Sequence, residues 1–223
     1  MIGSRTASLL VFAAAAVAPA TAAEKLSPVI WTLAAGTVSG AAAEPLVLGA
    51  PAVLDGGGAS FDGEDDAYVL DENPLAGAQA FTIEMLWRPD AGGPVEQRVL
   101  HIQEGEQHRL LIELRMVDAD HWVLDTFLRD GPEQRLTLIA RDRVHPAATW
   151  SWVALRYDGT TMSHFVNGRC DGEGPVAFRP MQDGQTSLGV RLNRVNWFRG
   201  AIREVHFHRR ALDVDELQRI SGE

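Results

Sequence analysis

Cysteine and lysine are almost absent from this sequence of 223 residues. Cys170 is the only cysteine, so no disulfide can form within the chain. A chain of this length can instead be stabilised by its own hydrophobic core. Nearly all of the 20 basic residues are arginine, and we attribute this bias to genome composition rather than to function.

Long hydrophobic runs are also missing, except near the start of the chain. The run from Ala7 to Ala18 is too short to span a bilayer. Arg5 precedes it, and the small residues Ala20, Thr21 and Ala22 follow it as a cleavage site. This order is typical of a secretory signal peptide, which we predict at residues 1–23. The protein is therefore expected to be exported, periplasmic or secreted, and not to span a membrane.

Basic residues are fewer than acidic ones: the sequence has 20 basic and 30 acidic residues, and its formal net charge is −10. Binding to phosphate groups requires a basic face, so this balance argues against nucleic acid and anionic lipid as partners. It leaves sugars and peptides open as ligands.

Helical periodicity is scarce, whereas short alternating apolar runs bounded by turn residues recur along the chain. We predict strands at residues 81–87, 98–103, 108–116, 121–128, 134–140, 150–157, 162–166, 187–192 and 201–208. Only residues 213–220 have a helical pattern. The expected fold is all-β, a two-sheet antiparallel jelly-roll sandwich with one short C-terminal helix or turn.

Four stretches of the sequence resemble a known family. They are Gly58 to Val69, Phe81 to Pro89, Trp152 to Gly168 and Phe198 to Leu217. Their order and spacing resemble the bacterial laminin-G-like branch of the concanavalin A-like lectin and glucanase superfamily. The resemblance implies one laminin-G-like domain over residues 24–223, with a convex and a concave sheet. Members of this family bind carbohydrate, protein or calcium, and some relatives cleave glycans.

The acidic turn, residues 62–66, is a candidate calcium site. Asp62, Asp65 and Asp66 could supply the several oxygens that calcium requires. An EF-hand is excluded, because Ala67 replaces the glycine of that loop and Asn73 its final glutamate. The alternative is a solvated turn without an ion.

The resemblance adds one more candidate ligand for this ion. In the family, an acid on the last strand often pairs with the acidic turn. Arg203 stands at that position here, and Glu204 follows it. We therefore include Glu204 with Asp62, Asp65 and Asp66 as the predicted metal ligands.

Catalytic motifs of the family are not found. No strand carries the Glu-x-Asp-x-x-Glu pattern of the glucanases. The Ile112 to Arg115 stretch resembles an alginate-lyase strand, but Leu111 replaces its preceding arginine. The sequence thus favours a protein that is not an enzyme. As an alternative, a glycan lyase or hydrolase would use Glu84, Glu113, Arg115 and Asp125.

Charged residues that alternate with apolar ones should lie on the outer face of a sheet. An exported module with such a face could bind a polar or acidic glycan through arginine. The predicted ligand-binding residues are Glu113, Arg115, Asp125, Arg191, Asn193, Arg194, Trp197 and Arg203. The alternatives are that these charges form ion pairs between strands and that Trp197 belongs to the core.

We therefore predict a carbohydrate-binding module for a glycan or cell-surface polysaccharide, with the site on the concave sheet face and its adjoining loops. A protein-interaction module without a small ligand is a further alternative. His206 and His208 have a spacing that suits zinc on one strand face, but the sequence identifies no third ligand. No zinc site is predicted.

Overall fold

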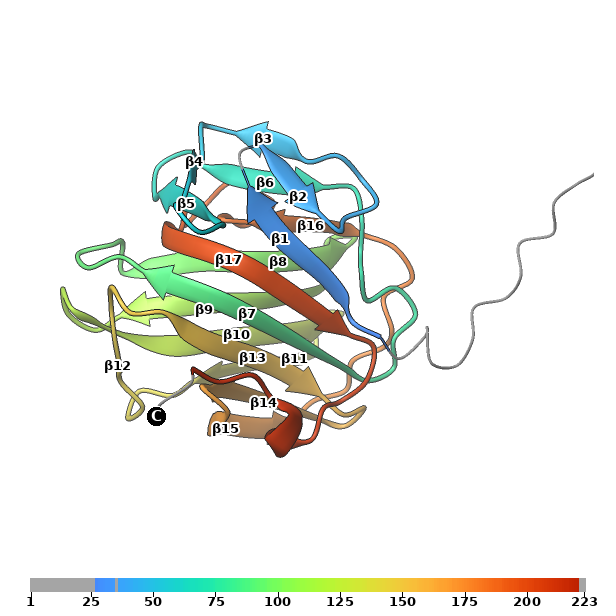
Figure 1. Ribbon diagram of the computed structural model, residues 1–223. Coiled ribbons are helices and arrows are strands. Elements are labelled where there is room, and N and C mark those ends of the chain that lie inside the picture. The colour runs from blue at the N-terminus through green and yellow to red at the C-terminus, as the bar shows by residue number, and fades with distance from the viewer. Residues whose placement is uncertain (1–26, 35, 221–223) are drawn as a thin grey trace, which may run out of the picture.

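The computed structural model describes residues 27–34 and 36–220. The predicted signal peptide at residues 1–23 lies outside these residues. Two antiparallel sheets face each other across one hydrophobic core (Figure 1). The expected all-β jelly-roll sandwich is thus confirmed, and the only helix described is the single 3₁₀ turn η1 (Val214–Glu216). None of the described residues forms a helix long and apolar enough to cross a membrane.

The nine-stranded sheet lies in front in Figure 1. Its order is β15 (Arg169–Pro175), β14 (Thr161–Val166), β13 (Ser151–Tyr157), β7 (Phe81–Pro89), β17 (Arg199–His208), β1 (Val29–Ala34) and β2 (Thr37–Ser39). At its side, β5 (Ala59–Asp62) pairs with β17, and β4 (Ala52–Val53) pairs with β5.

The eight-stranded sheet lies behind it. Its order is β11 (Gln134–Ile139), β10 (His121–Asp130), β9 (His108–Met116), β8 (Glu96–Glu104), β16 (Gln185–Leu188), β6 (Ala67–Leu70) and β3 (Leu46–Leu48). The short strand β12 (His145–Pro146) pairs with β10.

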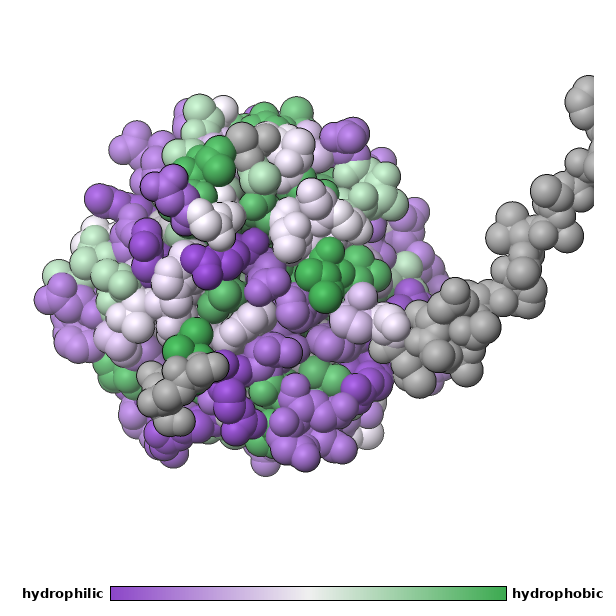
Figure 2. Space-filling model, in the orientation of Figure 1, coloured by the Kyte–Doolittle hydropathy of each residue, from purple (hydrophilic) through white to green (hydrophobic). Residues whose placement is uncertain are grey.

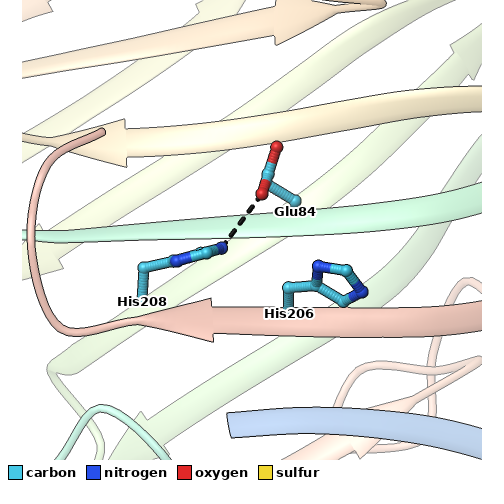
Figure 3. Close-up of side chains that lie close together, drawn as sticks. All are labelled: Glu84, His206 and His208. Atoms are coloured by element: carbon cyan, nitrogen blue, oxygen red, sulfur yellow. Dashed lines mark hydrogen bonds and ion pairs between the residues drawn. The ribbon is translucent and has the colours of Figure 1, made fainter. Parts of the chain in front are cut away.

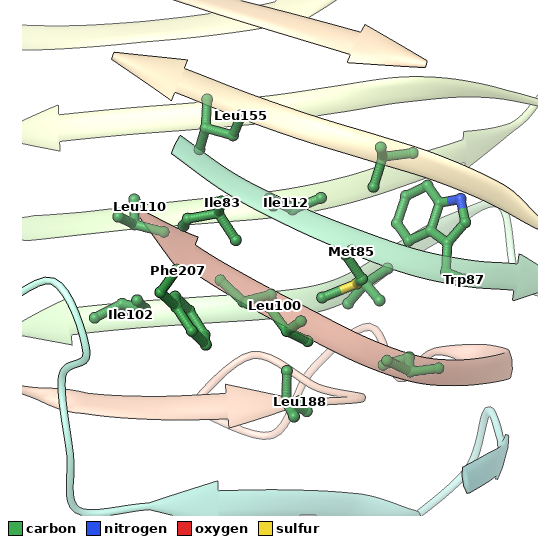
Figure 4. Packing of buried hydrophobic residues seen from close by; sticks show 14 of the residues in the cluster. Ile83, Met85, Trp87, Leu100, Ile102, Leu110, Ile112, Leu155, Leu188 and Phe207 are labelled. Atoms are coloured by element: carbon green, nitrogen blue, oxygen red, sulfur yellow. The ribbon is translucent and has the colours of Figure 1, made fainter. Parts of the chain in front are cut away.

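The core forms because apolar residues occupy alternate positions of facing strands. Figure 4 shows Ile83, Met85 and Trp87 of β7 with residues from the eight-stranded sheet such as Leu100 and Ile112. Trp87 also meets Trp122 of β10 edge to face, with ring centroids 5.1 Å apart. Both tryptophans are fully buried. Burial of each large apolar side chain contributes roughly 1.5–3 kcal/mol, and such contacts across the core join the two sheets.

The outer faces carry the remaining side chains. Figure 2 views the molecule from the side of the nine-stranded sheet, where hydrophobic residues form small patches among hydrophilic ones. On β9, Leu110, Ile112 and Leu114 point into the core, so the charged residues Glu113 and Arg115 lie on the outer face of the eight-stranded sheet. The alternation predicted from the sequence therefore directs these charges away from the core.

Several elements differ from the predicted strand ranges, and the short strands β1 to β6 and β12 are not among those ranges. β16 ends at Leu188 rather than at residue 192, because Gly189 adopts a positive φ of 90° and turns the chain. β15 was not predicted, since glycines and charges interrupt its apolar pattern. The helical pattern of residues 213–220 yields only η1, yet Leu217 is buried against Ala154 of β13 as an apolar stripe would require.

Candidate functional site

Four arginines gather in one pocket on the outer face of the eight-stranded sheet. The pocket has a volume of about 210 Å³. We call it the arginine pocket, and its lining is Arg98, Arg109, Leu111, Glu113, Arg115, Phe127, Thr137 and Arg191. Strands β8, β9, β10 and β11 supply all of these residues except Arg191, which follows β16. Local positive charge is therefore concentrated on a protein whose net charge is −10.

Two acidic residues form the floor of this site. Glu113 of β9 and Asp125 of β10 are directly opposite each other in the strand register. Their side chains are 6% and 0% exposed. Arg98 Nε lies 2.6 Å from Glu113 Oε1, and Arg115 Nε donates to Asp125 Oδ2 at 2.7 Å. Glu96 forms ion pairs with both of these arginines, so Arg98 and Arg115 are already held by carboxylates.

Burial changes the protonation of the acid pair. It raises the pKa of Glu113 to about 8, and the negative charge of Asp125 acts in the same direction, against the opposing effect of Arg98 and Arg115. Burial also raises the pKa of Asp125, although the hydrogen bond from Arg115 opposes this. At neutral pH the pair therefore retains a proton, and the raised pKa places this proton on Glu113.

Arg109 and Arg191 differ from the other two arginines because, within residues 27–34 and 36–220, neither forms an ion pair with a carboxylate. Arg109 Nη1 donates to the Glu106 carbonyl, and its guanidinium lies 5.5 Å from the centre of the Phe127 ring. Burial lowers the pKa of Arg109, and the positive charge of Arg191 lowers it further. Two neighbouring positive charges repel each other when no counter-ion is close. A bound anion would offset this repulsion and would itself be held by both guanidinium groups.

The position of Arg191 is set by the chain that follows β16. Ser187 Oγ donates to the Val190 carbonyl at 2.6 Å, and Leu192 N donates to His101 Nδ1 at 3.1 Å. His101 is fully buried, and burial together with Arg191 and other arginines lowers its pKa to about 3. The Ser187 hydroxyl therefore holds the backbone before Arg191, and Nδ1 of the neutral His101 imidazole, as an acceptor, holds the backbone after it.

The predicted ligand-binding residues are only partly brought together. Glu113, Arg115 and Arg191 line the arginine pocket, and Asp125 lies beneath Arg115. Asn193 lines a neighbouring pocket with acidic residues such as Glu104, whereas Arg194 and Trp197 line neither of these two pockets.

Two predicted residues lie on the other sheet. Arg203 of β17 stacks on the ring of Trp150, with its guanidinium carbon 4.6 Å from the ring centre. Glu84 of β7 bonds to His208 of β17, so the structure does not bring it to Glu113 and Asp125. The expected grouping of the four alternative catalytic residues on one face is therefore wrong, because β7 and β9 belong to different sheets.

The predicted ligand-binding residues do not include Arg98, Arg109, Phe127 and Thr137, which also line the arginine pocket. Arg109 and Phe127 follow the same alternation as Glu113 and Asp125 on β9 and β10, and that signal could have found them. Arg98 faces Glu113 through the β8–β9 register, which no local pattern specifies.

In the part of the chain that the structure describes, two groups of side chains could hold a metal ion. The first is Asp62, Asp65 and Asp66 of the acidic turn, and the second is Glu84, His206 and His208. In the acidic turn, Asp62 Oδ1 accepts hydrogen bonds from three backbone amides. Burial opposes them, but these bonds lower the pKa of Asp62. Glu204 bonds to His206 at 3.2 Å and is not part of the Asp62, Asp65 and Asp66 group. The structure therefore does not bring this predicted fourth ligand to the acidic turn.

The two facing sheets form a jelly-roll sandwich of the concanavalin A-like type. Residues 62–218 match the laminin G type of the concanavalin A-like lectin/glucanases superfamily, and the chain belongs to that family. No curated protein matches the sequence.

Solved structures share this fold at low sequence identity. The CBM40 of Ruminococcus gnavus IT-sialidase, bound to α2,3-sialyllactose, is 20% identical with a TM-score of 0.59, covering 72% of this chain and 94% of its own. A second similar structure is domain 4 of AbnA, a GH43 extracellular arabinanase from Geobacillus stearothermophilus, in complex with arabinotriose. It is 16% identical with a TM-score of 0.60, and the match covers 85% of this chain and 97% of that domain. The receptor-binding domain of botulinum neurotoxin C/D mosaic serotype is 11% identical with a TM-score of 0.64. The match covers 86% of this chain and 50% of the neurotoxin chain.

Proposed function

We propose that this protein is an exported carbohydrate-binding module whose ligand is an acidic glycan or cell-surface polysaccharide. The observation that carries the proposal is the pair Arg109 and Arg191. They line one pocket, and the structure gives neither a carboxylate partner. A guanidinium presents a planar fork of donors that matches a sugar carboxylate. The rest of the protein is acidic, so this local charge favours an anionic group at this position.

The size of the arginine pocket supports recognition of one unit of a longer chain. Its volume of about 210 Å³ is below that of a typical small-molecule site of roughly 300–1,000 Å³. Phe127 offers an apolar surface beside the guanidinium of Arg109, which suits the apolar side of a sugar ring. The adjoining loop, with Asn193, Arg194 and Trp197, is available to further sugar units.

The structural neighbours support the same ligand class. One neighbour is bound to sialyllactose and another to arabinotriose. Sialyllactose carries a carboxylate, as our proposal requires of the ligand, whereas arabinotriose is neutral. The fold therefore accommodates both kinds of sugar, and the arginines decide between them in this chain.

An enzyme on this fold is the second candidate, and the Glu113–Asp125 pair is the observation that favours it. A protonated acid beside an ionised one is the arrangement used for general acid catalysis. Asp125 is 0% exposed and engaged by Arg115, which leaves no room for attack on a substrate. The geometry therefore supports binding better than glycan cleavage.

A glycan array with the purified protein tests the proposal. We expect binding to carboxylated or sulfated glycans, weakened by salt, and little binding to their neutral counterparts. Product analysis of each bound glycan distinguishes binding from lyase or hydrolase activity. Capture of a protein partner without any glycan signal would support the protein-interaction alternative and overturn the proposal.

Calcium at the acidic turn stays a prediction. Carboxylate oxygens are the ligands that calcium prefers, and the structure gives the Asp65 side chain no hydrogen-bond partner. The amides bound to Asp62 and Asp66 supply the alternative, in which the turn is complete without an ion. Export through the signal peptide likewise stays a prediction, tested by the N-terminal sequence of the secreted protein.

A further inference from the structure

Two histidines and one glutamate meet on the outer face of the nine-stranded sheet, away from the arginine pocket. His206 and His208 alternate on β17 and therefore lie on the same face. Glu84 of β7 is directly opposite His206 in the strand register. Figure 3 shows the three side chains together, and one potential ligand atom of each lies within 4.8 Å of the other two.

This cluster is shielded from solvent. The side chain of Glu84 is 2% exposed, that of His208 11% and that of His206 12%. Trp152 of β13 lies against His206, with ring centroids 5.1 Å apart. The segment after η1 passes over the glutamate, because Gln218 N donates to Glu84 Oε1 at 2.7 Å. The carboxylate is thus buried and oriented before any ion arrives.

Hydrogen bonds direct one atom of each residue toward a common point. Glu84 Oε1 is occupied by Gln218, and Oε2 lies 3.0 Å from His208 Nε2. His206 Nε2 bonds to Glu204 Oε2 at 3.2 Å, which leaves its Nδ1 for the cluster. In Figure 3 one ring nitrogen of His206 is turned toward Glu84 and His208, and the other is turned away. A carboxylate behind a metal-binding histidine is a recurrent feature of metal sites, and Glu204 occupies that place.

We propose that Glu84, His206 and His208 bind one Zn²⁺ ion or a similar first-row transition-metal dication. Two imidazoles and a carboxylate are a donor set that zinc accepts, whereas calcium requires oxygen ligands throughout. Tetrahedral bonds of ~2.0–2.1 Å place ligand atoms roughly 3.3 Å apart. The 3.0 Å contact between Glu84 and His208 already matches this spacing, and His206 completes it by a small rotation.

The charges also suit a dication. Glu84 and Glu204 together carry two negative charges, and no arginine or lysine is paired with either in the described residues. A buried charge is stabilised when opposite charge is close by, so a dication balances this pair. Three protein ligands leave the fourth position of the ion for water or for a ligand atom.

Zinc binding to tagless protein, stripped of metal by a chelator, tests this assignment. We expect one zinc per chain by elemental analysis, a zinc-dependent rise in thermal midpoint, and a Co²⁺ absorption spectrum of the tetrahedral type. Replacement His206→Gln or His208→Gln should weaken zinc binding more than about 10-fold. His121→Gln is the matched control, because His121 is exposed and pairs only with Asp118.

Two results with the wild type and the histidine variants would overturn the proposal, and a third concerns the acidic turn. One is a wild-type protein that takes up no zinc, and the other is an unchanged zinc affinity in the His206→Gln, His208→Gln double variant. The metal-free thermal midpoint of each variant shows whether it is folded. Asp62→Asn should retain zinc, since loss in that variant would place the ion at the acidic turn instead.

Discussion

Glu113 on β9 and Asp125 on β10 lie directly opposite each other, and both carboxyl groups are buried beneath the arginines of the pocket. Two acids so close cannot both ionise without a cost, so one of them retains its proton. The arginine pocket therefore carries a larger net positive charge at neutral pH than it would if Glu113 and Asp125 were both ionised. This follows because Glu113 is protonated there and no carboxylate of the described residues forms an ion pair with Arg109 or Arg191.

Replacement Glu113→Gln should change how stability depends on pH. The folded pKa of Glu113 is raised from 4.5 to about 8, so its contribution to stability is complete below pH 4.5 and is lost as the pH rises toward 8. Glutamine does not titrate, and the variant should gain stability relative to the wild type by up to ~1.4 kcal/mol per pH unit across this window. Urea unfolding at several pH values measures this difference. Parallel stability curves would contradict it, and Glu106→Gln, at an exposed position, is the control.

Replacement Arg191→Ala should weaken binding of an acidic glycan by ~10–100-fold, because a hydrogen bond to a charged group contributes roughly 1.5–3 kcal/mol. Calorimetric titration measures the affinity. Arg143→Ala is the control, since Arg143 is exposed and lines a different pocket. A larger loss in Arg194→Ala than in Arg191→Ala would place the glycan over the loop instead of in the arginine pocket.

Replacement Gly189→Ala should destabilise the protein by more than ~2 kcal/mol. Overpacking of the core and a strained backbone each contribute roughly 1–3 kcal/mol to this loss. Gly189 has a φ of 90°, and an added Cβ would lie 2.6 Å from the Phe61 ring. Gly92→Ala is the matched control, because Gly92 also has a positive φ but nothing lies within 4 Å of its Cβ position. Thermal unfolding compares the two, and an equal loss would show that backbone strain alone matters at Gly189.

Calcium in excess should raise the thermal midpoint if the acidic turn binds it, since an ion that binds only the folded state stabilises that state. Asp65→Asn should abolish the increase and leave the metal-free midpoint unchanged, because the structure shows no hydrogen bond to that carboxylate. An equal midpoint with calcium and with chelator would show that the amide hydrogen bonds complete the turn without an ion.

Much of the fold could be predicted because its signals are local. Alternation on β9 placed Glu113 and Arg115 outside and Leu110 inside, and a period of two needs only neighbouring residues. The short helix or turn expected after Asp213 is the single 3₁₀ turn η1, and tertiary contacts explain why it is no longer. Leu217 is buried against Ala154, and extended chain beyond η1 carries Gln218 to Glu84.

The sequence by itself determined which residues face outward, and hence that arginine and acidic side chains would line a sheet surface. Only the tertiary structure decided which of them meet. The Arg98–Glu113 pair depends on strand register, and Glu84 meets His206 because β7 and β17, far apart in the chain, are neighbours in one sheet. Side-chain alternation is a property of each strand alone, whereas register is set by the packing of the whole core. For that reason the folded protein alone shows that Glu84 lies beside His206 and His208.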